Sequence, residues 1–202
     1  MSKKITSLFN FKKLQKFSSA LMLPIAILPA AGLILAIGIS FNIELLANCG
    51  GLIFANLPLL FCVGIVIGLT GDGSSSLSAI ISYMIMNATM GTQLGITAES
   101  VAASNGDYAM ILGVPTLQTG VFGGLIVAIF VYLLYTRFHN IELPQFLGFF
   151  GGKRFVPIIT AVAAIIVGYL LPWLWITVQK GLASLSTLVT SGHNANFAAV
   201  IY

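Results

Sequence analysis

Few side chains in this 202-residue chain could do chemistry, because only 7% of its residues are charged. Two of the cations stand side by side in "LGFFGGKRFVPI", where Lys153 and Arg154 follow a pair of glycines. Adjacent cations can attract an anionic group such as a phosphate, and they can also fix the orientation of a membrane protein. The residues alone leave both interpretations open.

No pattern of catalytic or metal-binding residues accompanies these cations. His139 and His193 have no cysteine, histidine or carboxylate partner at ligand spacing, so neither a metal site nor a cofactor is expected. The stretch "TGDGSSS" lacks the lysine and the spacing of a phosphate-binding loop, and it predicts a tight turn with a serine cap on the next helix. The acids all fall in expected connections, so no catalytic residue is predicted in this chain. They are Glu44, Asp72, Glu99, Asp107 and Glu142.

Composition places the chain in a membrane. Hydrophobic residues make up 58% of the sequence and the mean hydropathy is +1.03, both far from the usual range of soluble domains. The net charge of +4 comes from cations that flank apolar runs, so it indicates orientation in the membrane. Because no basic patch is interleaved with aromatic residues, no nucleic-acid partner is expected.

Long uncharged intervals predict the spanning elements. Each can supply the roughly 20 apolar residues that cross a hydrocarbon core, and no alternation typical of barrel strands interrupts them. The expected fold is an all-α integral membrane bundle of about five transmembrane helices. They are predicted near residues 18–40, 52–70, 75–91, 116–136 and 155–178.

Two flanking segments complete the expected organisation. Residues 1–17 mix five lysines with apolar residues, which is typical of an amphipathic helix lying at the membrane surface, or simply of a basic flank. Residues 18–178 form the transmembrane part. Residues 179–202 are expected to be an amphipathic segment followed by the start of an incomplete span, "FAAVIY", as if the chain were the front portion of a longer protein.

Charge distribution predicts the sidedness of the bundle. Cations before the first span and between the fourth and fifth place the N-terminus in the cytoplasm, whereas Lys180 falls on the outer side. Trp173 and Trp175 are expected in an outer aromatic belt, and Tyr135 in an inner one. On this topology, Lys153 and Arg154 lie in a cytoplasmic connection.

Small and polar residues within the apolar runs predict packing sites or a solute path. "GIVIG" gives small residues at the spacing that allows close helix packing, within the chain or in a dimer. Polar groups in the third span must face protein or water, and "GVPTLQTGVFGG" is either an unwound helix near a cavity or a plain loop. The residues concerned are Gly64 and Gly68 for packing, and Asn87, Thr89, Gln118 and Thr119 for a solute path or packing.

Four stretches, in order, resemble one known family. They are "LQKFSSALMLPIAILPAAGLILAIG", "IFANLPLLFCVGIVIGL", "GVPTLQTGVFGG" and "IELPQFLGFFGGKRFVPI". They are similar to the membrane-embedded sugar permease subunit, EIIC, of the bacterial phosphoenolpyruvate-dependent phosphotransferase system. Within the glucose, N-acetylglucosamine and maltose group, the glucose-specific Gram-positive members are the most similar. The resemblance runs along essentially the whole chain.

This resemblance implies a homodimeric permease of the bacterial cytoplasmic membrane whose front half forms the dimer scaffold. A sugar, here glucose, is taken up and phosphorylated at its 6-hydroxyl by a phosphocysteine of a cytoplasmic EIIB unit. The family's "GITEP" loop and the EIIB cysteine site are absent from this sequence. Lys153 and Arg154 would then lie near the mouth where phosphorylated EIIB approaches, and would couple uptake to phosphotransfer.

Three functions remain open from the sequence. The leading one is the N-terminal part of a glucose-type permease that cannot complete phosphorylation alone. The alternative is a truncated, non-catalytic membrane scaffold that dimerises and needs a separate C-terminal half. The third is a channel or facilitator unrelated to phosphotransfer.

Overall fold

The computed structural model describes residues 11–104 and 106–191, and they are almost entirely helical. Its elements are α1 Phe11–Ile25, α2 Leu28–Ser40, α3 Glu44–Ala55, α4 Leu57–Thr70, α5 Gly73–Gln93, α6 Ala98–Ala103, β1 Tyr108–Ile111, β2 Val114–Leu117, α7 Gly120–Phe138, the 3-10 turns η2 Gln145–Phe150 and η3 Gly152–Arg154, and α8 Phe155–Ser191. The all-α membrane bundle predicted from hydropathy is confirmed, with one small sheet added.

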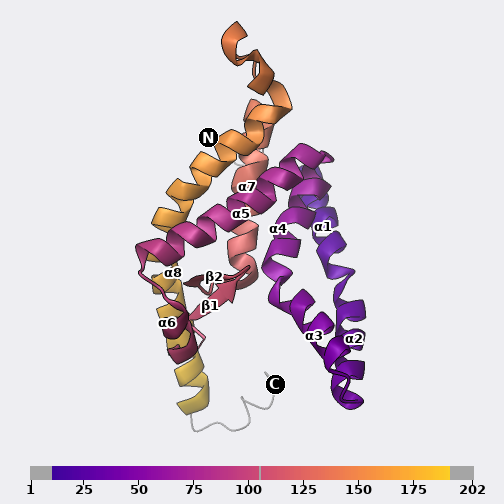
Figure 1. Cartoon of the computed structure of the whole chain (residues 1–202), viewed down its shortest axis with the longest axis vertical. Coiled ribbons are helices and arrows are strands. Elements are labelled where there is room, and N and C mark those ends of the chain that lie inside the picture. Colours follow the sequence, from indigo (N-terminus) through magenta and orange to yellow (C-terminus); the bar gives the residue numbers. More distant parts are fainter. Residues whose placement is uncertain (1–10, 105, 192–202) are drawn as a thin grey trace.

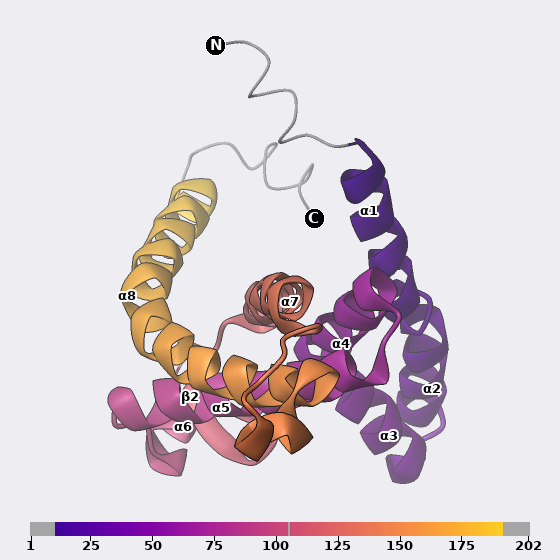
Figure 2. The same cartoon turned by 90° about the horizontal axis from the view of Figure 1, so that it is seen from above.

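The helices run between two ends of an elongated molecule (Figure 1). One end gathers the start of α1, the α4–α5 turn, the last turn of α7 and the start of α8, and we call it the Lys153 end. The opposite end gathers the α2–α3 turn, α6 and the β1–β2 hairpin, and we call it the hairpin end. Seen from above, α7 lies between α1 on one side and α8 on the other (Figure 2).

The first predicted span corresponds to two consecutive helices, α1 and α2, with only residues 26 and 27 between them. Pro24 stands in the last turn of α1 and Pro29 in the first turn of α2, where its missing amide donor costs nothing. The described part of the basic N-terminal segment, residues 11–17, belongs to α1, and residues 1–10 lie outside the described residues. The surface-helix prediction is therefore untested over most of its length.

The second predicted span, residues 52–70, starts inside a helix that the sequence analysis took for a connection. Helix α3 begins at Glu44, whose carboxylate suits a helix N-terminus, and it packs antiparallel on α2. A Cβ on Gly50 would lie 2.7 Å from Leu35, which shows how closely the two backbones approach. Helices α3 and α4 then meet at a bend of 56°.

The core lies where α4, α5, α7 and α8 meet. Cys62, Tyr83 and Val127 are fully or almost fully buried there, and Cys62 is a free thiol. Helix α8 crosses α5 at Gly168, where a Cβ would lie 2.8 Å from the carbonyl oxygen of Met86. Small residues thus bring backbones together, as is usual in membrane bundles.

A two-stranded hairpin precedes α7, so the predicted fourth span starts too early at residue 116. Strands β1 and β2 pair antiparallel, with Ile111 opposite Val114. Leu112 and Gly113 form the turn with φ of 51° and 81°, the left-handed pair that matches the twist of two-residue hairpins. "GVPTLQT" is therefore strand and turn, neither an unwound helix nor a plain loop.

Helix α8 is longer than the predicted fifth span of residues 155–178, because it continues to Ser191 through the segment expected to be separate. Residues 192–202, with the expected start of a further span, lie outside the described residues. Trp175 contradicts the aromatic-belt prediction, since it is only 8% exposed and packs against Leu117, whereas Trp173 is 73% exposed.

Within the described residues, length and hydropathy qualify three helices as membrane spans, or up to four if α3 and α4 count as one bent span. They are residues 15–40, 120–138 and 152–181, with the bent pair 44–55 and 57–70. Helix α5 is long enough but too polar to be counted, because serine, threonine and asparagine interrupt its apolar face. Three or four of the about five predicted spans thus meet this test of length and hydropathy in the described residues.

Candidate functional site

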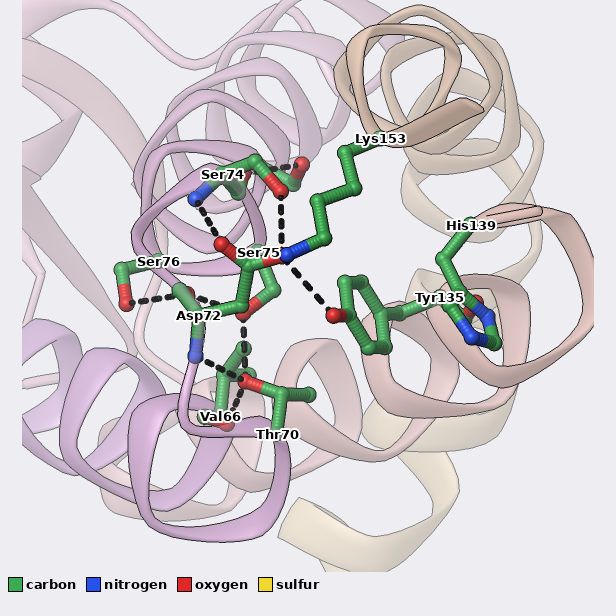
Figure 3. A network of polar contacts seen from close by, with 10 residues as sticks. Val66, Thr70, Asp72, Ser74, Ser75, Ser76, Tyr135, His139 and Lys153 are labelled. Carbon is green, nitrogen blue, oxygen red and sulfur yellow. Dashed lines mark hydrogen bonds and ion pairs between the residues drawn. The ribbon is translucent and has the colours of Figure 1, made fainter. Parts of the chain in front are cut away.

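Asp72 forms the centre of a polar cluster at the Lys153 end (Figure 3). Helix α4 ends at Gly71, whose φ of 69° reverses the chain, and Asp72 then caps α5. Its carboxylate accepts hydrogen bonds from the backbone N–H of Ser74 at 3.3 Å and from the Ser74 hydroxyl at 3.1 Å. The cap is therefore an aspartate and not the serine expected from "TGDGSSS", and its negative charge faces the positive end of the helix.

Two residues from distant parts of the chain converge on the same carboxylate oxygen. The Tyr135 hydroxyl, from the last turn of α7, donates to Oδ2 of Asp72 at 2.8 Å. The Lys153 ammonium, from η3, forms an ion pair with this atom at 3.1 Å. Asp72 thus joins the α4–α5 turn, the end of α7 and the start of α8 (Figure 3). Tyr135 is buried here and does not belong to an aromatic belt.

These contacts stabilise the ionised form of Asp72. Its pKa is lowered from 3.8 to about 2, first by the hydrogen bond from Tyr135 and further by Lys153 and Ser74, while desolvation opposes the shift. The Asp72 side chain is 16% exposed and that of Lys153 is 60% exposed. The carboxylate is therefore a fixed anion at neutral pH, and Lys153 is held by it while remaining in contact with solvent.

Hydroxyl groups extend the cluster into the turn beneath Asp72. The Thr70 hydroxyl donates to the carbonyl oxygen of Val66 at 2.8 Å and accepts from the Asp72 N–H at 3.3 Å. The Ser75 hydroxyl lies 2.6 Å from that of Thr70 and 2.6 Å from the carbonyl oxygen of Asp72. The polar residues of "TGDGSSS" therefore build a rigid turn around the anion.

Arg154 points to a different partner from its neighbour. Its guanidinium lies 4.9 Å from the centre of the Phe149 ring and donates to the Phe149 carbonyl oxygen at 3.3 Å. Within the described residues, no carboxylate pairs with it. The two adjacent cations thus differ, because Lys153 is neutralised by Asp72 whereas Arg154 keeps its positive field at the surface.

The connection between α7 and α8 outlines an open depression of about 690 Å³ beside this cluster. His139 stacks on Tyr135 with ring centres 5.0 Å apart, and the Gly152 N–H donates to the carbonyl oxygen of Ile141 at 2.9 Å. Glu142 contributes a carboxylate to the same depression. The lining of the depression therefore carries the negative charge of Glu142, and neither Lys153 nor Arg154 belongs to it.

The polar residues predicted for a solute path or packing lie in different surroundings: Asn87 is buried, whereas Thr89 is half-buried beside a groove. Asn87 is 1% exposed. Its side-chain amide N–H donates to the Tyr83 carbonyl oxygen at 2.8 Å, and its backbone carbonyl oxygen accepts from the Thr116 hydroxyl at 2.9 Å. Thr89 donates to the Ile85 carbonyl oxygen and lines an open groove of about 630 Å³ between α5 and α8.

Gln118 and Thr119, from the same prediction, connect the hairpin to α7. The carbonyl oxygen of Gln118 accepts the indole N–H of Trp175 at 3.0 Å, while Thr119 is 1% exposed and precedes the first residue of α7. Thr119 packs against Gly123. Gln118 and Thr119 do not line the groove that Thr89 lines.

Gly64 and Gly68, predicted for helix packing, lie against α1. A Cβ on Gly64 would be 2.8 Å from Cδ of Pro24, and one on Gly68 would be 2.6 Å from Cβ of Ala20. In this arrangement the two glycines face a helix of the same chain.

Asp72 is the residue that the sequence analysis missed. It was set aside with the other acids as part of a connection, although Glu44 and Glu99 also turn out to lie in helices. A signal existed, since aspartate two residues before a serine run is a good helix cap. Its partners, 63 and 81 residues further along the chain, could not be inferred from spacing.

The cluster fixes charges and holds elements together. Within the described residues, no three side chains that could ligate a metal gather at this cluster. Arg154, which has no ion pair in the described residues, lies at the end of the α7–α8 connection, next to the point where Lys153 anchors it.

Comparison with known proteins gives a consistent result. A family described as "Phosphotransferase system, EIIC" matches residues 18–202. The "PTS system glucose-specific EIICBA component" of Staphylococcus saprophyticus is 43% identical over 196 residues, covering 87% of this chain and 29% of that protein. The chain therefore spans less than a third of the length of this relative.

Proposed function

The chain belongs to the phosphotransferase system EIIC family, and on this premise we propose that it forms part of a membrane permease that couples hexose uptake to phosphorylation. Glucose is the proposed sugar. The observation that carries this proposal is the 43% identity to a protein named as glucose-specific. The apolar helices support it, since the passage of a polar sugar needs a membrane-embedded protein.

The Lys153 end is proposed to face the cytoplasm. Gly64 and Gly68 pack against Pro24 and Ala20, so the start of α1, with its lysines, lies beside the end of α4. Arg137, Lys153 and Arg154 are at the same end. This concentration of cations supports a cytoplasmic orientation by the positive-inside rule, with the N-terminus inside.

The proposed partner at this end is a phosphorylated EIIB unit, which carries the phosphoryl group. Arg154 supplies a positive field that favours its approach, since no carboxylate in the described part neutralises it. Lys153 holds the connection in place through Asp72. The two cations predicted to act together are thus proposed to have separate roles.

A second copy of the chain is the proposed partner within the membrane. The outer faces of α2 and α3 expose large apolar side chains, with Leu33 65%, Leu45 71% and Leu52 65% exposed. Lipid or a second copy can cover such a surface. The scaffold role that the resemblance implies favours the homodimer.

The proposal can be tested with a chimera. The segment of the Staphylococcus saprophyticus component that aligns with this chain is replaced by residues 1–202, and membranes are assayed for phosphoenolpyruvate-dependent phosphorylation of glucose, N-acetylglucosamine and maltose. Phosphorylation that is fastest with glucose is expected. A chimera that reaches the membrane at normal levels but phosphorylates none of them would contradict the permease role and favour a non-catalytic scaffold.

Sugar flux without phosphorylation would instead favour a facilitator. The unaltered Staphylococcus saprophyticus component serves as the positive control, and a chimera whose EIIB cysteine is replaced by serine serves as the negative control. The comparison separates loss of phosphotransfer from loss of membrane insertion.

A further inference from the structure

A small pocket of about 270 Å³ lies at the hairpin end, between the β1–β2 hairpin and α8. It is more enclosed than the depression beside Lys153, because strand, helix and the end of α5 each contribute a wall. Its apolar lining comes from Leu94, Tyr108, Leu117 and Ile176, and its polar lining from Asp107, Gln179 and Lys180.

Hydrogen bonds between the hairpin and α8 fix the walls. Trp175 donates its indole N–H to the Gln118 carbonyl oxygen at 3.0 Å, and Gln179 donates to that of Asp107 at 3.4 Å. The Gln118 N–H also donates to the Asp107 carbonyl oxygen at 2.9 Å. Because Trp175 and Gln179 are four residues apart, they lie on the same face of α8, and this face makes both hydrogen bonds to the hairpin segment. The pocket is therefore preformed.

The charged groups of this pocket are not used by the fold. The Asp107 carboxylate receives only a long contact of 3.5 Å from the Gln179 amide, and within the described residues the one ion pair joins Lys153 to Asp72. Lys180 is exposed and makes no ion pair there. The Asp107 carboxylate, a hydrogen-bond acceptor, and the Lys180 ammonium, a donor of up to three hydrogen bonds, therefore line the pocket without an ion pair in the described residues.

These groups match the chemistry of a neutral sugar ring. Carboxylate, amide and ammonium groups can accept from and donate to neighbouring hydroxyls, while Leu117, Ile176 and the half-buried ring of Tyr108 offer apolar surface to the C–H face. Small-molecule sites typically measure roughly 300–1,000 Å³, and this pocket, at about 270 Å³, lies just below that range, which limits it to a ligand about the size of a single ring.

We propose that the pocket formed by Asp107, Tyr108, Gln179 and Lys180 binds a free hexose at the hairpin end, apart from the cationic cluster at the Lys153 end. The choice of a hexose and the placement of this pocket on the outer face rest on the proposed function. The existence of a preformed polar pocket rests on the structure alone. Such a site would collect sugar before it moves toward the opposite end.

Fluorescence of the purified full-length chain in lipid nanodiscs tests the proposal. The sequence has two tryptophans, and Trp173 is exposed, so a Trp173→Phe variant leaves Trp175 as the single reporter. Trp175 packs against Leu117, a residue of the pocket. Titration with D-glucose should give a saturable change, whereas L-glucose, with the same bulk properties, should not.

Two substitutions should weaken this binding. Asp107→Asn and Lys180→Met each remove one charged hydrogen-bonding group, and each should raise the apparent Kd for D-glucose about tenfold or more. Glu44→Gln is the matched control, because it removes an acid at the same end outside the pocket. Circular dichroism and gel filtration establish folding, and if one variant fails to fold the other decides the question.

Several results would overturn the proposal. One is the absence of a saturable change up to about 100 mM D-glucose, which is 100-fold above a Kd of about 1 mM, or about 4 kcal/mol of binding. Another is an Asp107→Asn variant that binds D-glucose as tightly as the unaltered chain. A third is saturable binding of an amino-acid zwitterion in place of D-glucose. Failure here together with normal glucose phosphorylation by the chimera would remove only this pocket. Binding here together with an inactive chimera would remove only the proposed function.

Discussion

Replacing Asp72 by asparagine should destabilise the Lys153 end while leaving the backbone turn intact. Asparagine is also a good helix cap, so the hydrogen bond from the Ser74 N–H can persist. What disappears is the negative charge that Tyr135 and Lys153 share. The substitution therefore isolates the electrostatic part of the cluster.

The size of the effect follows from the pKa of Asp72. Its fall from 3.8 to about 2 sets an upper limit of roughly 2.5 kcal/mol, at about 1.4 kcal/mol per pKa unit. Lys153 is 60% exposed, so solvent screening reduces its share to under about 1 kcal/mol. The hydrogen bond from buried Tyr135 carries the larger share, and the expected total loss is about 1–2 kcal/mol.

The pH dependence has a defined sign. Because the folded-state pKa of Asp72 lies below its unfolded value, this stabilisation is complete above about pH 4 and is lost as the pH falls through about 2. Thermal unfolding in detergent at pH 7 should show a Tm lower by roughly 2–8 °C for Asp72→Asn. The difference from the unaltered chain should shrink between pH 4 and pH 2.

Glu44→Gln is the control for losing an acid that has no side-chain partner in the described residues. The reasoning is refuted if Asp72→Asn is as stable as this control at pH 7. It is also refuted if the Tm difference stays unchanged down to pH 2, because the charge of Asp72 would then not be its source.

Two further predictions concern the same bundle. Tyr135→Phe should lower the free energy of unfolding by about 1–1.5 kcal/mol and Lys153→Met by under about 1 kcal/mol, measured by thermal unfolding at pH 7; the opposite order would mean that the ion pair dominates. Gly68→Leu should lower the free energy of unfolding by about 1–3 kcal/mol, because the new side chain would collide with α1. Gly51→Leu is the control and should be close to neutral, because nothing lies within 4 Å of its Cβ position. Equal unfolding temperatures of the two variants would show that α1 does not pack as described.

Hydropathy predicted the helical elements well because the membrane leaves few backbone solutions. Each of the five predicted intervals overlaps a helix of the structure. The helix boundaries were predicted wrongly where a charged residue was taken for the end of a helix. Glu44 starts α3 and does not lie in a connection, and α8 continues past Lys180 to Ser191. A single charge at a helix terminus or on an exposed face does not end a helix.

Tertiary contacts account for what the sequence could not show. Helical geometry places Trp173 and Trp175 on different faces of α8, but only the position of the hairpin decides which one is buried. Lys153 was recognised from its neighbours in the sequence. Asp72 and Tyr135 acquired their roles only through folding, because Asp72, Tyr135 and Lys153 come from three elements with long separations along the chain.

Coupling at the Lys153 end is tested most directly by comparing phosphorylation with uptake in cells that carry the chimera, with Lys153 intact or replaced by glutamate. Uptake is measured with 6-deoxyglucose, which lacks the hydroxyl that accepts the phosphoryl group. The account predicts that Lys153→Glu, which sets two carboxylates against each other at Asp72, reduces glucose phosphorylation more than 6-deoxyglucose uptake. Equal loss of both would contradict a coupling role and leave Lys153 as a determinant of topology and as the residue that anchors the connection to Asp72.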